Sequence, residues 1–553
     1  MTINSGESQR PLVGRSVVST QLGIVAANHP LAAAAGVDML QRGGNAVDAA
    51  IAANAMMGLL EPASNGIGGD LFALYNESKS GKSFGINASG WSPARLNADI
   101  LRAQGILDMP PTGIHTVTVP GAVAGWDSLR SRFGTLPFAD LLAPAIHYAE
   151  AGFPVTEIVA RGWENCAERL HTHPNTAKAY LVNGHAPRAA EIFKNSDLAA
   201  SLRRIAQSGR DGFYRGPTAE AMLDLSRELG GTMMADDLER YEPEWVDPIS
   251  TTYRGWTIQE IPPNSTGIAA LMMLNMMEQF PLKQWGFHSA KALHVMIEAK
   301  KLAFADLVRH IGDPKFSRIS VETLLSRDHA IRRAGEIDME RAALHVEPVH
   351  LDGFTNSTGH DTIYLCAVDR DGNIASLIQS IYSGFGSGLV PRGTGFALHN
   401  RGALFTLQPD HPNTLMPRKR PLHTIIPGFM EKDGVRIGFG IMGGFNQPQA
   451  HAQFVANVAD FDFTIQEALE AGRFTKSTFD GCDVSVEPMI PESVLRELHA
   501  LGHELSVEPY RSGTFGWGHA VMCTESGVHL GASEPRHDGA AIPQVTPHNG
   551  YRV

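Results

Sequence analysis

The pattern of hydrophobic and polar positions predicts a chain that mixes helices and strands from its first hundred residues onward. Residues 31–41 and 46–60 have helical patterns, and the glycine pair between them is typical of a helix end. The second helix is apolar on every side, which indicates that it is buried. Strand patterns lie on either side of this pair of helices, at residues 17–30 and 71–76.

The middle of the chain has mainly helical patterns. They dominate between residues 120 and 280, although residues 251–261 are strand-like, and further helices are predicted at 268–280 and 288–310. Residues 312–360 are polar and rich in turn-forming residues. We therefore expect that segment to be irregular, exposed and mobile.

The main boundary in the sequence falls between residues 361 and 362. Directly after it, TIYLCAV and NIASLIQSIY have strand patterns, and DRDG between them predicts a hairpin. Strands and turns then alternate to the end of the chain, with short helices predicted near 465–473 and 492–501.

Composition and charge are those of a globular protein. The 553 residues are 43% hydrophobic and 19% charged, and the formal net charge of −12 argues against a nucleic-acid or anionic-membrane partner. The four cysteines are too widely spaced to indicate a zinc ribbon or a disulfide framework. The polar start lacks the apolar core of a secretory signal, so we expect a cytoplasmic protein.

Several short motifs have ordinary structural explanations. Asp369, Asp371 and Asn373 are spaced like the start of a calcium loop, but the glycine comes too early, so a hairpin turn is favoured. GKSFG has the spacing of a nucleophilic serine, Ser83, but no helical pattern follows, which favours a β-turn. The glycine loops NGIGGD and FGSG lack the spacing of a dinucleotide site, and the sequence has no G-x-x-x-x-G-K-[ST] phosphate loop. We predict neither a metal nor a cofactor.

Thr362 offers a different chemistry. A threonine hydroxyl is a poor nucleophile unless a base lies beside it, and a free α-amine on the same residue can serve as that base near neutral pH. The chain would first have to be cut between Asp361 and Thr362. A polar, turn-rich segment followed abruptly by a buried strand suits such a cut.

Ordered segments along most of the chain carry a shared signature. They are HPLAAAAGVDMLQRGGNAVDAAIAANAMMGLLEPASNGIGGDLF, TVTVPGAVAGWDSLRSRFGTLPFADLLAPAIHYAEAGFPV, IPPNSTGIAALMMLNMME, DTIYLCAVDRDGNIASLIQSIYSGFGSGLVPRGTGFALHNRG, KRPLHTIIPGF, MGGFNQPQ and GASEPRHDGAA. Together they resemble the γ-glutamyltranspeptidase family of N-terminal-nucleophile hydrolases. The resemblance implies an α+β fold, a four-layer αββα sandwich cut into a large chain (1–361) and a small chain (362–553) that form one intertwined domain.

The resemblance also implies the catalytic residues. Thr362 would be the nucleophile, its new amine the base, and Ser380 the hydroxyl that hydrogen-bonds the nucleophile. Gly443 and Gly444 match the glycine pair whose backbone N–H groups form the oxyanion hole. In the precursor, the Thr362 hydroxyl would attack the Asp361 carbonyl, and an N-to-O acyl shift followed by hydrolysis would free the new N-terminus.

The substrate-binding positions depart from those of γ-glutamyl enzymes. Where such enzymes have an arginine, an asparagine, a glutamine, an aspartate and two serines, this chain has Ala98 (with Arg95 nearby), Tyr382, Arg401, Leu404, His423 and Thr424. The lost aspartate removes the partner of a substrate ammonium, whereas Arg401 adds a donor fork suited to a carboxylate. The candidate substrate-binding residues are Tyr382, Asn400, Arg401, His423 and Thr424.

These departures resemble γ-glutamyltransferase-like members of the family, which include oxamate amidohydrolases. We predict a self-cleaving amidohydrolase or acyltransferase for a small carboxylate-bearing amide, with Arg401 as its anchor. The alternatives are a glutathione hydrolase or γ-glutamyltransferase with a rebuilt glutamyl site, a non-catalytic binding homologue, and a serine hydrolase that uses Ser83. The expected partners are the small-molecule substrate and the two chains of the precursor, and a dimer of such heterodimers is one assembly that the resemblance allows.

Overall fold

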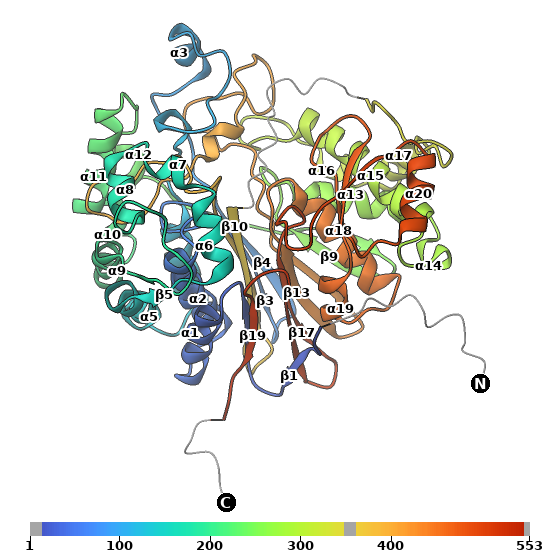
Figure 1. Ribbon diagram of the computed structural model, residues 1–553, viewed down its shortest axis with the longest axis horizontal. Coiled ribbons are helices and arrows are strands. Elements are labelled where there is room, and N and C mark those ends of the chain that lie inside the picture. The colour runs from blue at the N-terminus through green and yellow to red at the C-terminus, as the bar shows by residue number, and fades with distance from the viewer. Residues whose placement is uncertain (1–13, 348–360, 547–553) are drawn as a thin grey trace, which may run out of the picture.

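The computed structural model describes residues 14–347 and 361–546 (Figure 1). Residues 348–360, the last part of the segment predicted to be mobile, lie outside the described residues. In the described residues, no helix is both long and apolar enough to cross a bilayer.

Two seven-stranded antiparallel sheets lie face to face at the centre of the described part of the chain (Figure 1). The first sheet has the strand order β19 (Ala540–Pro543), β2 (Ile24–Ala27), β10 (Asp361–Val368), β11 (Ile374–Tyr382), β3 (Asp70–Glu77), β4 (Lys82–Ala88) and β7 (Glu244–Val246). The second sheet has the order β1 (Val18–Thr20), β18 (His529–Ser533), β17 (Gly518–Cys523), β13 (Val435–Ile441), β12 (Gly428–Lys432), β9 (Trp256–Glu260) and β8 (Ile249–Tyr253).

Helices cover the outer face of each sheet. The first sheet is covered by α1 (Pro30–Gln41), α2 (Ala46–Leu60) and α4 (Ala122–Phe133), with α5 (Phe138–Ala151) and α9 (Ser196–Ser208) outside them. The second is covered by α13 (Gly267–Met277), α15 (Ala290–His310), α18 (Asn446–Ala459) and α19 (Ile465–Glu470). The predicted four-layer αββα sandwich is confirmed.

Smaller elements surround these layers. The helices are α3 (Ala98–Ala103), η1 (Ile114–Thr116), α6 (Glu157–Glu164), α7 (Ala167–Leu170), α8 (Pro174–Tyr180), α10 (Asp211–Tyr214), α11 (Gly216–Glu228), α12 (Ala235–Glu239), α14 (Leu282–Trp285), α16 (Val321–Leu324), α17 (Arg327–Ala334), η2 (Arg401–Leu404) and α20 (Glu492–Ala500). The strands are β5 (Phe153–Pro154), β6 (Ile192–Phe193), β14 (Phe474–Thr475), β15 (Asp483–Val486) and β16 (Glu504–Val507).

The alternation of side chains along β10 positions Thr362. Tyr364 and Cys366 belong to the core between the two sheets, whereas Ile363 and Leu365 pack in the core beneath the helices of the first sheet. Because side chains on a strand alternate between its faces, Thr362 shares the face of Tyr364 and points between the sheets.

Both sheets combine strands from either side of Thr362. In the first sheet, β2, β3, β4 and β7 precede it and β11 and β19 follow it; in the second, β1, β8 and β9 precede it and the other four follow it. A cut before Thr362 would therefore leave two segments that share both sheets and the helix layer over the second sheet. The division into a large and a small chain stays a prediction.

The structure corrects three expectations about local elements. Residues 17–30 form two strands in different sheets, β1 and β2, because the chain turns at Leu22, whose N–H bonds Thr20 Oγ1 at 3.1 Å. Residues 251–261 form part of a hairpin, β8–β9, whose turn is Arg254-Gly255 with positive φ at both residues. The segment expected to be irregular contains α16 and α17.

Candidate active site

Thr362 and Ser380 face one another on adjacent strands. They are directly opposite in the β10–β11 register, beside a bulge between Asp361 and Thr362. The Thr362 hydroxyl donates a hydrogen bond to Ser380 Oγ at 3.1 Å, and both side chains are buried. The structure therefore brings together the predicted nucleophile and its predicted partner.

Asp70 extends this pair into a row of three. It begins β3 and lies opposite Ser380 on the other side of β11, so Thr362, Ser380 and Asp70 share one face of the first sheet. The preceding Gly69 packs against the Ser380 backbone, where a Cβ would lie 2.4 Å from the carbonyl oxygen. Only glycine fits there.

Arg401 lies over this row from η2. Its Nη2 donates to Ser380 Oγ at 2.9 Å, its Nη1 donates to Thr424 Oγ1 at 2.8 Å, and the guanidinium carbon lies 4.5 Å from the centroid of the Tyr382 ring. The side chain is 0% exposed, and its Nε finds no hydrogen-bond partner among the described residues. Arg401 is thus a buried cation beside the predicted nucleophile, with one donor unused.

The charge of Arg401 is balanced by Asp70. Burial lowers the pKa of Arg401 to about 10, against the opposing effect of Asp70, so the guanidinium remains charged at neutral pH. Burial alone would raise the pKa of Asp70, but His399, His423 and Arg401 outweigh it and hold this pKa below its ordinary value. Asp70 therefore stays ionised inside the sandwich.

Burial lowers the pKa values of the two histidines around Asp70. His423 Nε2 lies 3.0 Å from Asp70 Oδ2 while its Nδ1 accepts the Ile425 N–H, and burial lowers the pKa of His423 to about 3. His399 Nδ1 lies 3.5 Å from the same carboxylate oxygen, and burial also lowers its pKa. His423 and Thr424 thus contact Asp70 and Arg401 and hold them in place.

Asn400 has a bridging position. Its side-chain amide donates to the Pro111 carbonyl at 2.7 Å and to Ser383 Oγ at 3.1 Å, while its Oδ1 accepts the Ser383 N–H. These bonds fix the loop that follows β11 against the segment before η1.

The second sheet approaches Thr362 through β13. A Cβ at Gly438 would lie 2.6 Å from Ile374, at the far end of the β10–β11 hairpin, whereas a Cβ at Gly440 would lie 2.4 Å from the Tyr364 ring. β13 therefore packs closely on the first sheet. It runs toward the end of β10 at which Thr362 lies.

The turn after β13 follows the part of that strand that packs on Tyr364. Met442, the next inward-facing residue, belongs to the core between the sheets, and Gly443 and Gly444 follow it with φ of 124° and 59° before α18 begins. Within the described residues, neither glycine N–H has a hydrogen-bond acceptor. Two free amide donors at a glycine turn have the character of an oxyanion hole.

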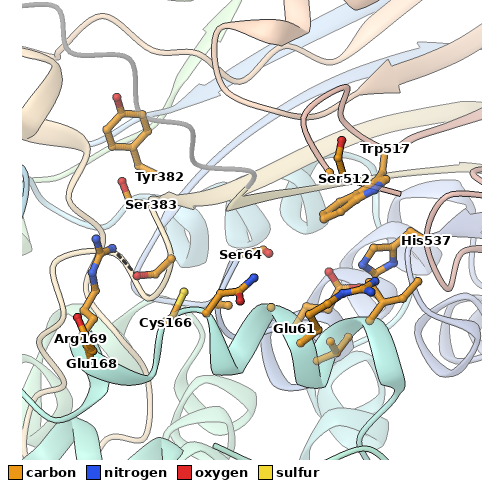
Figure 2. A pocket seen from close by; sticks show the side chains of 18 of the residues that line it. Glu61, Ser64, Cys166, Glu168, Arg169, Tyr382, Ser383, Ser512, Trp517 and His537 are labelled. Atoms are coloured by element: carbon orange, nitrogen blue, oxygen red, sulfur yellow. Dashed lines mark hydrogen bonds and ion pairs between the residues drawn. The ribbon is translucent and has the colours of Figure 1, made fainter. Parts of the chain in front are cut away.

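A cavity of about 880 Å³ opens beside this machinery (Figure 2). Tyr382, Ser383 and Gly384, which end and follow β11, line one side of it, and Trp517, whose carbonyl accepts the Met442 N–H, lines another. Of the predicted site residues, Tyr382 is the one that lines this cavity. Thr362, Arg401 and His423 are buried near it.

The other motifs have structural roles. Asp369 accepts the N–H groups of Asp371 and Asn373, which confirms the hairpin turn. Ser83 lies in strand β4 rather than in the predicted β-turn, and its Oγ accepts a bond from Asn76. Arg95 is exposed outside the cavity lining, whereas Ala98 and Leu404 are buried in apolar clusters.

One buried group has the composition of a metal site. His294, Glu298 and His503 place ligand atoms within 4.8 Å of one another. However, His294 Nδ1 and His503 Nε2 are already hydrogen-bonded at 2.8 Å, and the Lys301 ammonium lies 2.7 Å from Glu298 Oε1. The lysine charge already occupies the place of a cation.

Sequence reasoning missed Asp70, His399 and Glu61. Asp70 stands in the glycine segment NGIGGD, and the only signal was an acid placed directly before a buried strand. Glu61 follows α2 and lines the cavity, and burial raises its pKa to about 8.

Comparisons with known proteins agree with this architecture. The model of the family described as Gamma-glutamyltranspeptidase matches residues 32–544. A glutathione hydrolase-like YwrD proenzyme of Bacillus subtilis is 35% identical over 96% of this chain and 100% of its own length. An oxamate amidohydrolase proenzyme of Klebsiella pneumoniae is 34% identical over 95% of this chain and 99% of its own.

A solved structure shows the same fold. The crystal structure of a cephalosporin acylase from Bacillus halodurans is 41% identical and has a TM-score of 0.90, with 98% of this chain and 99% of that one covered. With a family match over most of the sequence and a shared N-terminal-nucleophile hydrolase fold, the chain belongs to the gamma-glutamyltranspeptidase family.

Proposed function

We propose that this protein is a self-cleaving amidohydrolase in which Thr362, freed as an N-terminus, forms an acyl ester with a carboxylate-bearing amide. The observation that supports the proposal is the hydrogen bond from the buried Thr362 hydroxyl to Ser380. Gly443 and Gly444, whose N–H groups have no acceptor among the described residues, follow the strand that packs on β10. The names of relatives, which are proenzymes acting on amides, support the same reading.

Self-cleavage begins with attack of Thr362 Oγ1 on the carbonyl carbon of Asp361. The Asp361–Thr362 C–N bond breaks as the acyl group moves from nitrogen to oxygen, and the hydroxyl proton passes to the departing nitrogen. Water then hydrolyses the ester, which leaves a carboxyl group on Asp361 and a free α-amine and hydroxyl on Thr362.

Turnover repeats this chemistry on a substrate. The α-amine takes the hydroxyl proton, the oxygen attacks the substrate carbonyl, and the Gly443 and Gly444 N–H groups stabilise the oxyanion. The leaving amine receives the proton, and water or an acceptor amine releases the acyl group. Ser380, held by the Arg401 guanidinium, orients the hydroxyl.

Substrate contacts divide into two groups. Tyr382 at the cavity wall and the unused Nε of Arg401 behind it are the proposed contacts to the substrate. Asn400, His423 and Thr424 hold these two in place through the bonds described above. An oxamate-like amide and a γ-glutamyl amide are both candidates, since relatives are named for oxamate and for glutathione.

Trapping the acyl-enzyme tests the proposal. The cleaved protein is mixed with γ-glutamyl-p-nitroanilide or with oxamate, quenched in acid, and the small chain is analysed by mass spectrometry after digestion. We expect the acyl mass on the peptide that begins with Thr362. Steady turnover with no acyl adduct on that peptide, or an adduct on another residue, would contradict it.

A further inference from the structure

The cavity beside Thr362 has walls from widely separated parts of the chain. The segment 61–64 after α2 and the helix α6 form one part of it, and the loops 382–384 and 511–517 form another (Figure 2). Its volume of about 880 Å³ lies toward the upper end of the range for drug-sized ligands, which is roughly 300–1,000 Å³. A substrate as small as oxamate would leave most of it empty.

Apolar side chains form part of the cavity lining. They are Met109, Ile158, Val159, Ala403 and Trp517, together with the ring of Tyr382. Such a wall favours a substrate with an apolar or aromatic body between its scissile amide and its other polar groups.

The charged groups at the rim are mainly arginines. Arg161 on α6 is exposed and has no carboxylate within 4.0 Å among the described residues, and Arg511 is exposed and donates to the Pro535 carbonyl. A third, Arg169, donates to the carbonyl oxygens of Gly384 and Gly386 and holds that loop. Glu168 is the exposed acid among them.

The buried acid on the floor does little to offset this charge. Glu61 is 4% exposed, accepts a bond from Asn28 Nδ2 at 3.1 Å, and lies 3.8 Å from His537 Nδ1 (Figure 2). Because burial raises its pKa, this carboxyl is mostly protonated at neutral pH. The cavity therefore presents a net positive rim above a neutral floor.

We propose that the cavity binds an amide of drug-like size whose anionic group, remote from the scissile bond, is held by Arg161 and Arg511. The inference rests on the proposed function, and it assigns the anion to two residues that lie outside the set around Arg401. Guanidinium groups suit a carboxylate because they can donate two parallel hydrogen bonds to it.

Three matched amides test this assignment. Pentanoyl-p-nitroanilide is uncharged, glutaryl-p-nitroanilide adds a carboxylate on the acyl side, and N-pentanoyl-4-aminobenzoate adds one on the leaving-amine side. Specificity constants are measured for wild type, Arg161→Gln, Arg511→Gln and the control Arg496→Gln. Arg496 is exposed on α20 and pairs with Glu492, outside the cavity lining.

We expect wild type to prefer at least one of the carboxylate amides to the uncharged one. We then divide the specificity constant for the preferred carboxylate amide by that for the uncharged amide. Arg161→Gln and Arg511→Gln should each lower this ratio about tenfold, which is the effect of losing one charge-assisted hydrogen bond. If both variants keep the ratio of Arg496→Gln, the assignment is overturned. Failure of cleaved wild type to hydrolyse any of a wide range of amides would instead overturn the proposed function, and the inference with it.

Discussion

The Thr362 hydroxyl lies 3.1 Å from the hydroxyl of Ser380, which stands directly opposite it on the neighbouring strand. Ser380 Oγ also accepts bonds from Arg401 Nη2 and from the Tyr382 N–H. These bonds fix Ser380, and through it the rotamer of Thr362, before any peptide bond is broken. The orientation of the proposed nucleophile is thus already set in the uncut chain.

Replacement of Ser380 by alanine should slow self-cleavage. The hydroxyl of Thr362 would lose its partner, and we expect the rate to fall at least about tenfold, as for the loss of one orienting hydrogen bond. The rate at which the two chains appear on a denaturing gel measures this. Ser376→Ala is the matched control, because Ser376 lies on the same face of β11 but bonds Tyr364 and the Gly428 carbonyl. Equal rates in the two variants would contradict the orienting role.

Asp70 and Arg401 should be coupled in stability. Asp70→Asn leaves the buried guanidinium without its counter-charge, and we expect a loss of about 3–5 kcal/mol in the free energy of unfolding. The double variant Asp70→Asn/Arg401→Met should recover part of that loss, as judged by urea unfolding. Additive losses in the double-mutant cycle would show that the two charges act independently.

The Asp70–Arg401 pair also predicts how the stability of the folded protein depends on pH. The pKa of Asp70 is depressed in the folded protein, so its stabilisation is present above the ordinary value of 3.8 and is lost as the pH falls through the folded value. Unfolding midpoints measured against pH should fall less steeply below pH 4 in Asp70→Asn than in wild type.

A side chain in the Gly443-Gly444 turn should lower activity more than it lowers stability. Gly444→Ala places a Cβ at a φ of 59° and would shift the N–H groups of the proposed oxyanion hole, so we expect turnover to fall at least about tenfold. Gly434→Ala carries a similar backbone cost at a φ of 80° in the exposed β12–β13 turn. Comparable losses of activity in the two variants, at similar thermal stability, would argue against an oxyanion role.

Glu61 predicts a pH dependence of substrate choice. With a pKa near 8, it becomes anionic as the pH rises through that value, next to Asn28, His537 and Asp538. The pKa of His537 is lowered to about 4, so it stays neutral there. The preference for a carboxylate amide over the uncharged one should decline above about pH 8 in wild type. A similar decline in Glu61→Gln would assign the effect to another group.

The sequence predicted most of the architecture because its periodicities are local. The helices at 31–41 and 46–60 and the β10–β11 hairpin follow from side-chain patterns and turn residues that lie close together in the chain. Which sheet a strand joins does not follow from such patterns, and β1 and β2 were therefore expected to be one strand. For the β8–β9 hairpin, the dipeptide Arg254-Gly255 was the local sequence feature that could have predicted the turn.

Long-range electrostatics limited the prediction of the site. Arg401 was expected to anchor the substrate carboxylate, but its burial depends on Asp70, which is more than three hundred residues away in the chain. Likewise, the pairing of Glu61 with His537 joins the end of α2 to the loop after β18. Thr362 could be proposed from the sequence because its chemistry requires only a cut at one place in the chain, and its role as the nucleophile stays a prediction.

The intact mass of the purified protein under denaturing conditions tests the central claim most directly. Wild type should give two chains, the smaller beginning at Thr362, and Thr362→Ser should still cleave because it keeps a hydroxyl. Thr362→Ala should remain one chain of 553 residues. Two results would contradict the claim: wild type that stays whole after long incubation, or Thr362→Ala that is cut at the same bond. Either would show that Thr362 is not the nucleophile that cleaves the Asp361–Thr362 bond.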